Sequence, residues 1–345
     1  MFNIKPLATL TKTDIEATIN NKTKPVGSLG QLETLATQLA LILGADNPQL
    51  HKPTQLVFAG DHGVSELGVS IANSEVTGLM VANFCRGGAA INIFCQQHDM
   101  ALEVIDCGTV FEQPDHSMLV KQRLGDTTKP FNTAPAMTKE QTTDGLTFGA
   151  NVAQKAIDNG TNIIGIGEMG IGNTTSAAAI MHVLTGHDIN LCVGQGTGVD
   201  EETITLKKNI VQQAISLHKD NLFTPIDILT HLGGFEIAQM VGAMLAIAQA
   251  EKVVIVDGFI SSVAALIACD INPNVRDYMI FSHCSKEFGH HLILRKLNAN
   301  AILDLNLCLG EGSACPLALP LLQSALAFYN NMASFEQANI TIEQA

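Results

Sequence analysis

The amino-acid sequence predicts an α/β fold: a doubly wound, mostly parallel sheet flanked by helices, with a small helical subdomain built from both termini. Short β-branched runs repeatedly end in glycine and are followed by helical segments, which is typical of a parallel sheet covered on both faces. Segments near both termini have helical spacing without an accompanying strand. Of the 345 residues, 46% are hydrophobic and 15% charged, so the chain can bury a large core.

The predicted elements alternate in order along the chain. A helix is expected first, from the spacing in "LGQLETLATQLALIL" (29–43). Strand-and-glycine segments follow at "TQLVFAGDHG" (54–63), "TNIIGIG" (161–167), "INLCVGQGTG" (189–198) and "EKVVIVDG" (251–258). The helical segments that come after them are 74–94, 173–184, 200–218 and 259–268. The polar, proline-containing stretch at 112–145 is predicted to be a surface excursion, and a last helical pattern covers 317–338.

These patterns divide the chain into two predicted parts. Residues 1–45 and 320–345 are expected to form the small helical subdomain, and residues 46–319 a Rossmann-like α/β catalytic domain. Ligands of open parallel sheets bind outside the carboxyl ends of the strands. The glycine loops are therefore expected to line one crevice.

Composition and charge exclude several classes of protein. The most apolar region is interrupted by Glu251, Lys252 and Asp257 before a membrane-spanning length accumulates. The amino-terminal segment lacks an apolar core and a small-residue cleavage site, so a cytoplasmic protein is predicted. The eight cysteines are scattered without a C-x-x-C pair, which favours free thiols. The eleven histidines show no zinc-site spacing, so no metal is expected.

The net charge limits the partners. The formal charge is −14, with 19 Lys and Arg residues and no basic cluster, which argues against nucleic acid and against anionic membranes. A small anionic ligand stays compatible with this charge if one site supplies local positive potential.

The glycine-rich stretch "GIGEMGIGNTTSAAA" (165–179) matches two nucleotide motifs, and each lacks its decisive residue. The P-loop pattern has Asn173 in place of the lysine that binds the β- and γ-phosphates. A dinucleotide fold needs an acid at the end of the next strand, but Asp188 precedes "INLCVG". A phosphate monoester fits better, held by N–H groups at a helix start and by the Thr174 and Thr175 hydroxyls. The alternative is a tight turn with Asn-Thr-Thr as an ordinary N-cap.

Two glutamates are flanked by glycine in predicted loops of this sheet. Glu168 follows a strand end inside the stretch just described, and Glu311 lies in "LDLNLCLGEGSACP", where an apolar run breaks into Gly-Glu-Gly. Little side-chain bulk shields such acids from a ligand. Partial desolvation would raise their pKa toward the range useful for proton transfer. For each acid the alternative is a solvated loop residue.

Several motifs resemble the nicotinate-nucleotide:dimethylbenzimidazole phosphoribosyltransferase family, in the same order and over nearly the whole chain. They are "KPVGSLGQLE" (24–33), "FAGDHGVSELGVS" (58–70), "GGAAIN" (87–92), "GEMGIGNTTSAAA" (167–179), "VGQGTGVD" (193–200), "GGFEIAQMVGAML" (233–245), "VDGFISSVAALIA" (256–268), "SHCSKEFGHH" (282–291) and "LGEGSACPLALPLL" (309–322). The resemblance implies transfer of a 5-phosphoribosyl group from nicotinate mononucleotide to 5,6-dimethylbenzimidazole or a related base. The products are α-ribazole 5′-phosphate, used in assembling the nucleotide loop of cobalamin, and nicotinate. It also implies a homodimer and no cofactor.

The resemblance also assigns roles to residues. Glu311 corresponds to the general base, and Glu168 lies beside the ribose. The phosphate and ribose are expected to contact Gly170, Gly172, Asn173, Thr174, Lys207 and Gly310, with Lys207 supplying the cation that the loop lacks. The alternative for Lys207 is a solvated helical lysine. Candidate residues of the base pocket are Ser74, Met80, Asn83, Phe84 and Leu309, for which an apolar helix face is the competing explanation.

The chain departs from the family pattern at a few positions. Gln195 and Cys308 stand where arginine is usual, Ser313 and Ala314 fall where Gly-Thr-Gly-Ala is usual, and a glutamine expected before Met80 is missing. Because Glu311 and Glu168 are retained, these changes bear on the choice of base rather than on the reaction. Two other functions stay open: a non-catalytic homologue that binds a nucleotide monophosphate, and a dinucleotide-dependent oxidoreductase.

Overall fold

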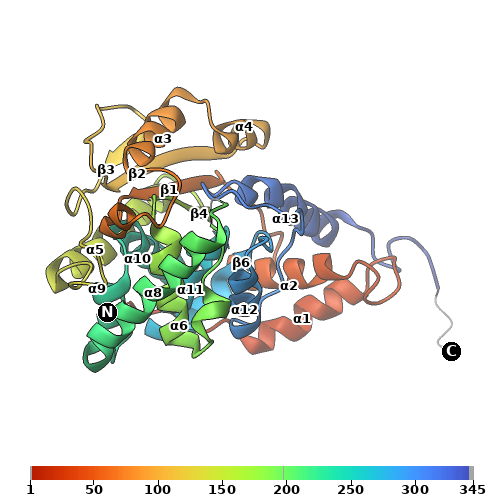
Figure 1. Cartoon of the computed structure of the whole chain (residues 1–345). Coiled ribbons are helices and arrows are strands. Elements are labelled where there is room, and N and C mark those ends of the chain that lie inside the picture. The colour runs from red at the N-terminus through yellow and green to blue at the C-terminus, as the bar shows by residue number, and fades with distance from the viewer. Residues whose placement is uncertain (1, 197, 342–345) are drawn as a thin grey trace.

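The computed structural model describes residues 2–196 and 198–341 and shows a six-stranded sheet flanked by helices (Figure 1). The strand order is β3-β2-β1-β4-β5-β6, and every neighbouring pair is parallel. The strands are β1 (Thr54–Gly60), β2 (Ala101–Gly108), β3 (Leu119–Lys121), β4 (Ile163–Met169), β5 (Val253–Val256) and β6 (Met279–Phe281). The predicted α/β class and parallel sheet are therefore confirmed.

Helices lie against both faces of the sheet. The α-helices are α1 (Thr9–Asn20), α2 (Gln31–Leu43), α3 (Glu75–Arg86), α4 (Ala90–Gln97), α5 (Lys139–Asp158), α6 (Asn173–Thr185), α7 (Ile189–Cys192), α8 (Glu201–His218), α9 (Pro225–Leu232), α10 (Phe235–Gln249), α11 (Phe259–Ile271), α12 (Phe288–Lys296) and α13 (Ala314–Asn331). The 3₁₀ helices are η1 (Gly63–Leu67), η2 (Lys219–Asn221) and η3 (Pro273–Tyr278). The fully buried strands β1 and β5 and the almost wholly buried helices α10 and α11 form the centre of the core.

The first two helices and the last helix of the chain lie together. Helix α13 packs against α2, and the segment after it pairs with the segment after α1 (Figure 1). The Thr23 N–H donates to the Ala333 carbonyl at 3.0 Å, and the Phe335 N–H donates to the Asn21 carbonyl at 3.1 Å. The division of the chain at residues 45 and 320 stays a prediction, since α13 begins at Ala314, before the predicted boundary.

Two sequence predictions were wrong in part. The segment 189–193 is not a strand: Ile189–Cys192 forms the short helix α7, because the Asp188 carboxylate accepts the Asn190 N–H and caps it, and Asn190 and Leu191 are exposed. The surface excursion at 112–145 includes strand β3 and the start of α5. β3 pairs with β2 at the edge of the sheet, and three residues are enough to form such a short strand.

One apolar stretch, 75–97, is long enough by composition to span a membrane, but it is two helices. Gly87, with a φ of 80°, ends α3 in the left-handed conformation, and α4 begins at Ala90. Both helices pack on β2. The eight cysteines are all free thiols, as predicted.

Glycines allow α5 and α10 to approach closely. A side chain at Gly149 would overlap the Gln239 carbonyl of α10, and a side chain at Gly242 would overlap the Leu146 carbonyl of α5. Because α10 also packs on β1, β2, β4 and β5, this contact fixes the layer beneath the centre of the sheet.

We predict that Gly149→Ala lowers the free energy of unfolding by about 1–3 kcal/mol, because the overlap with the Gln239 backbone outweighs the better helix propensity of alanine. Urea denaturation measures the change. Thr147→Ala on the exposed side of α5 is the control and is expected to change stability by less than about 0.5 kcal/mol. An unchanged midpoint for Gly149→Ala would contradict this description of the helix contact.

Candidate active site

The candidate site lies at the carboxyl ends of β1 and β4, where the strand order reverses. The chain runs outward from β1 to β2 and β3, then returns to place β4 on the other side of β1, so the loops after β1 and β4 diverge. Such a switch point is the usual place for ligands in open parallel sheets. At this edge, Glu168 is near the end of β4 and Gly170 comes directly after it, whereas Asp61 and His62 come directly after β1.

Glu168 is the penultimate residue of β4 and is 7% exposed. Its Oε2 accepts a hydrogen bond from the Asn173 side-chain amide at the start of α6. Burial, followed by the nearby Glu236, raises the pKa of Glu168 to about 8, and the Asn173 hydrogen bond opposes this rise. This shift has the direction expected from the sequence.

Glu311 is held beside Glu168 through the backbone. Its N–H donates to the Glu168 carbonyl at 3.0 Å, and its own φ is 68°. A side chain at Gly167 would collide with Gly312, so the two loops meet backbone to backbone. A side chain at Gly310 would likewise collide with Glu168 Oε1. The glycines around both acids therefore permit this close approach.

Asp257, directly after β5, fixes the loop that carries Glu311. Its carboxylate accepts the Gly312 N–H at 3.1 Å and the Ala314 N–H at 3.0 Å, which caps the start of α13. Burial raises the pKa of Asp257 to about 7, although these two N–H groups favour its charged form. The expectation that Glu311 follows a strand of the sheet was wrong: only Leu303, well before it, forms a bridge, with His283.

The Glu311 carboxyl is suited to accept a proton. Glu311 is 6% exposed, and its Oε2 is buried without a hydrogen-bond partner. Burial raises the pKa of this carboxyl, and the Ile91 N–H at the start of α4 opposes the rise. A raised pKa brings a glutamate closer to the pH at which general bases work. The alternative of a solvated loop acid is wrong for both Glu311 and Glu168.

The predicted phosphate loop turns tightly into α6. Gly172 has a φ of 93° and is the N-cap of the helix, with no side-chain cap, so the alternative of an ordinary Asn-Thr-Thr N-cap is wrong. A side chain at Gly170 would strike the Gly60 carbonyl. The Ile171 N–H donates to Thr77 Oγ1 of α3 at 3.1 Å, which anchors the loop. Thr175 is fully buried, and its hydroxyl has no partner.

Lys207 of α8 lies beside this loop and is 1% exposed, so the alternative of a solvated helical lysine is wrong. Its Nζ donates to Thr174 Oγ1 at 3.1 Å and to the Gly194 carbonyl at 3.2 Å. Burial lowers the pKa of Lys207, and Glu287 opposes this shift. A cavity of about 30 Å³ joins the phosphate-loop residues to this lysine; it is lined by Val69, Ser70, Gly170, Ile171, Gly172, Asn173, Thr174, Gln195 and Lys207.

The candidate residues of the base pocket are only partly gathered. Ser74 is the N-cap of α3, and its hydroxyl bonds Ser65 Oγ at 2.8 Å. Phe84 is fully buried in the core, as the apolar helix face would also require. Met80 and Asn83 are half-buried on α3, and Leu309, next to Gly310, is exposed. Their contact with a base stays a prediction.

Sequence reasoning missed three residues of this edge: Asp257, His62 and Glu236. His62 and Glu236 are both fully buried, and His62 Nε2 lies 2.7 Å from Glu236 Oε1. Each of the three stands near a glycine at a strand or helix end, in "VDG", "GDHG" and "GGFE". An acid or histidine near such a glycine is the same pattern that identified Glu168, so the sequence could have indicated these residues as well.

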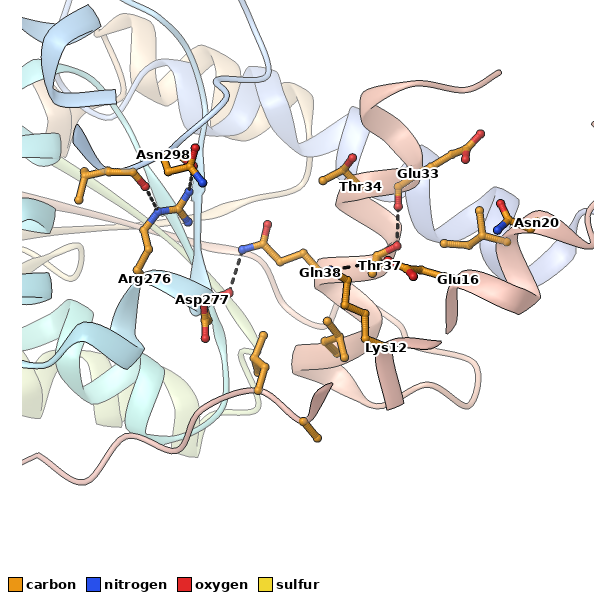
Figure 2. Close-up of a pocket in the computed structure, with 15 residues that line it drawn as sticks. Lys12, Glu16, Asn20, Glu33, Thr34, Thr37, Gln38, Arg276, Asp277 and Asn298 are labelled. Atoms are coloured by element: carbon orange, nitrogen blue, oxygen red, sulfur yellow. Dashed lines mark hydrogen bonds and ion pairs between the residues drawn. The ribbon is translucent and has the colours of Figure 1, made fainter. Parts of the chain in front are cut away.

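A cavity of about 780 Å³ lies elsewhere, between α1, α2 and the end of η3 (Figure 2). Its polar groups already bond the backbone: Gln38 donates to the Asp277 carbonyl at 2.8 Å, and Arg276 donates to the carbonyls of Leu297 and Asn298. None of the site residues predicted above lines it. The smaller cavity, by contrast, lies between the buried cation of Lys207 and the start of α6, an arrangement that favours an anion.

Comparisons with known proteins agree with this geometry. A phosphoribosyltransferase family model matches residues 4–340. Nicotinate-nucleotide–dimethylbenzimidazole phosphoribosyltransferase of Shewanella piezotolerans is 52% identical over 342 residues, covering 99% of this chain and all of the relative. The enzyme of the same name from Photobacterium profundum is 50% identical over the same coverage.

A solved structure is also similar. The crystal structure of CobT from Thermus thermophilus superposes with a TM-score of 0.93 at 38% identity, covering 97% of this chain and all of that one. A structure of nicotinate-nucleotide–dimethylbenzimidazole phosphoribosyltransferase from the same organism gives a TM-score of 0.92 at 37% identity, covering 98% of this chain and all of that one. The chain therefore belongs to the nicotinate-nucleotide–dimethylbenzimidazole phosphoribosyltransferase family.

Proposed function

We propose that this chain transfers the 5-phosphoribosyl group of nicotinate mononucleotide to 5,6-dimethylbenzimidazole or a related base, giving α-ribazole 5′-phosphate and nicotinate. The supporting observation is that a backbone hydrogen bond joins Glu311 to Glu168 at one edge of the sheet. The start of α6 lies next to Glu168, and Lys207 donates to this helix start. A proton acceptor, a carboxyl group for the ribose and a phosphate site are the parts that this reaction needs.

In the proposed reaction Glu311 is the general base. Glu311 Oε2 takes the N–H proton of the benzimidazole while its other ring nitrogen forms a bond to ribose C1′. The bond between C1′ and the pyridinium nitrogen breaks, and its electron pair leaves with nicotinate. The pyridinium ring carries a positive charge, and the electron pair that it takes neutralises this charge. The departure of nicotinate therefore requires no acid. The Glu168 carboxylate then faces the positive charge that spreads over C1′ and the ring oxygen.

The phosphate is proposed to bind between Gly170, Gly172, Thr174 and Lys207. The N–H groups at the start of α6 and the helix dipole favour an anion, and Lys207 adds the charge. The Asn173 amide holds Glu168, so Asn173 links the phosphate loop to the ribose carboxyl. The cavity of about 30 Å³ has room for roughly one or two water molecules.

The choice of base is proposed to depend on the residues near Glu311 and α3. Cys308, Leu309, Ser313 and Ala314 surround Glu311 in sequence, and Gln195 lies at the phosphate cavity. These include the positions at which the chain departs from the family pattern. We further propose a cytoplasmic homodimer that needs no cofactor, as the family resemblance implies.

We also propose that residues 1–45 and 320–345 act as one helical subdomain and that residues 46–319 form a doubly wound catalytic domain. The packing of α2 on α13 and the reversal of strand order between β1 and β4 support this division.

The helix at 189–192 opposes the oxidoreductase alternative. Because this segment is helical, Asp188 does not lie at the end of a following strand, where it would bind a ribose.

Incubation with nicotinate mononucleotide and a panel of benzimidazoles and purines tests the activity, with products identified by mass. Release of nicotinate together with a base-linked ribotide is the expected result. Nucleotide binding without nicotinate release would instead identify a non-catalytic homologue.

We predict that Glu311→Gln lowers kcat by roughly 10²- to 10⁴-fold while the Kd for nicotinate mononucleotide changes little, because the amide keeps the shape but cannot take the proton. Glu202→Gln, exposed at the start of α8, makes the same charge change and is expected to keep full activity. Near-normal turnover by folded Glu311→Gln would remove this residue from the role of base.

We predict that Lys207→Ala weakens nicotinate mononucleotide binding by about 10- to 150-fold, because a charge-assisted contact worth about 1.5–3 kcal/mol is lost. Binding of the dephosphorylated riboside is expected to change much less. Lys208→Ala, the half-buried neighbour, is the control. Equal affinity of the wild-type enzyme for nucleotide and riboside would contradict the phosphate assignment.

A further inference from the structure

A buried histidine–glutamate pair lies behind the catalytic edge. His62 directly follows Asp61 after β1, and Glu236 is in the first turn of α10. His62 Nε2 is 2.7 Å from Glu236 Oε1, and both side chains are 0% exposed. Among the residues that the structure describes, the remaining polar atoms, His62 Nδ1 and Glu236 Oε2, are buried and have no hydrogen-bond partner. Unsatisfied buried groups of this kind are costly, so a role in function is the better explanation.

The free oxygen of Glu236, Oε2, lies at the end of β1, the strand next to the β4 strand that carries Glu168. A side chain at Gly60 would lie 2.9 Å from Glu236 Oε2, so this oxygen lies against the end of β1 on the α10 face. Glu168 pairs in register with Phe58 of β1, two residues before Gly60, and residues so related point to the same face. Glu168 and Glu236 therefore share one buried space between β1, β4 and α10.

Two carboxyl groups in such a space do not both ionise readily. The groups that face Glu168 are Glu236 from α10, Asp257 from the end of β5, Glu311 from the loop before α13 and Asn173 from α6. The charged and titratable groups that face Glu236 include His62 and Asp61 from the turn after β1. Glu236 is the strongest of the charged influences on Glu168, and its position is fixed by His62.

We propose that His62 and Glu236 are a positioning pair that keeps Glu168 as a neutral carboxyl until the cationic pyridinium ring of the nucleotide binds. This proposal rests on the function proposed above. On binding, the Glu168 O–H bond breaks, the proton passes to solvent, and the carboxylate that remains faces the pyridinium. The pair thus makes nucleotide binding release a proton, and it favours a cationic nucleotide over one with an uncharged base.

The proton released on binding is a direct test. Because burial and Glu236 raise the pKa of Glu168 to about 8, this carboxyl is largely protonated at pH 7, and its ionisation on binding releases a proton that can be counted. Calorimetric titration with nicotinate mononucleotide in PIPES and in Tris, two buffers of different ionisation enthalpy, gives the number of protons released. In Glu168→Gln, the protons released on binding come from the phosphate. The excess of protons that the wild type releases over this variant comes from Glu168.

We predict that Glu236→Gln reduces this excess measurably, because the carboxyl group that adds to burial in keeping Glu168 protonated is removed. His62→Gln, which weakens the hold on Glu236, is expected to reduce it in the same direction and gives a second measurement if Glu236→Gln does not fold. Glu140→Gln, exposed in the first turn of α5, is the matched control and is expected to keep the full excess.

An excess in folded Glu236→Gln or His62→Gln equal to that of the wild type would overturn the proposal, as would equal proton release by the wild type and Glu168→Gln. Failure of the wild-type enzyme to bind nicotinate mononucleotide is a separate result. It would overturn the proposed function, and this proposal with it.

Discussion

The arrangement of the site depends on one carboxylate at the end of β5. Asp257 accepts the N–H groups of Gly312 and Ala314, so it both caps α13 and holds the Glu311 loop against the sheet. The Glu311 N–H completes the attachment by donating to the Glu168 carbonyl. The contact is close enough only because Gly167 and Gly312 have no side chains. The spacing of β4 and β5 therefore sets the distance between Glu168 and Glu311, and helix α13 begins at the same contact.

The charges of the site match those of the proposed substrate. Nicotinate mononucleotide has an anionic phosphate at one end and a cationic pyridinium at the other. Lys207 and the start of α6 form the positive end, whereas Glu168, Glu236, Asp257 and Glu311 are buried carboxyl groups at the other. Asn173 joins the two ends, since it starts α6 and donates to Glu168. Burial of these acids raises the pKa of Glu168, Asp257 and Glu311. A raised pKa is what the proposed general base requires, and also what a carboxyl group requires that stays neutral until a cation binds.

Much of this was predictable from the sequence because it depends on local rules. A β-branched run ending in glycine predicted β1, β4 and β5, and the glycines around Glu168 and Glu311 indicated a site. The same rule failed at 189–193, because the capping Asp188 favours a helix over an unpaired strand. The contact between Glu311 and Glu168 joins residues far apart in the chain through backbone groups, which leave no pattern in the sequence. The burial of Lys207 likewise depends on where the chain from Gly194 to Gly196 folds over α8.

The central claim is that the base, held by Glu311, attacks C1′ directly while nicotinate leaves from the opposite face. A single displacement inverts the anomeric centre, whereas a covalent ribosyl-enzyme on Glu168 would give two inversions and net retention. Proton NMR of the ribose anomeric signal of the product distinguishes the two. Starting from β-nicotinate mononucleotide, an α-linked product is expected; a β-linked product would contradict direct displacement and make Glu168 the nucleophile.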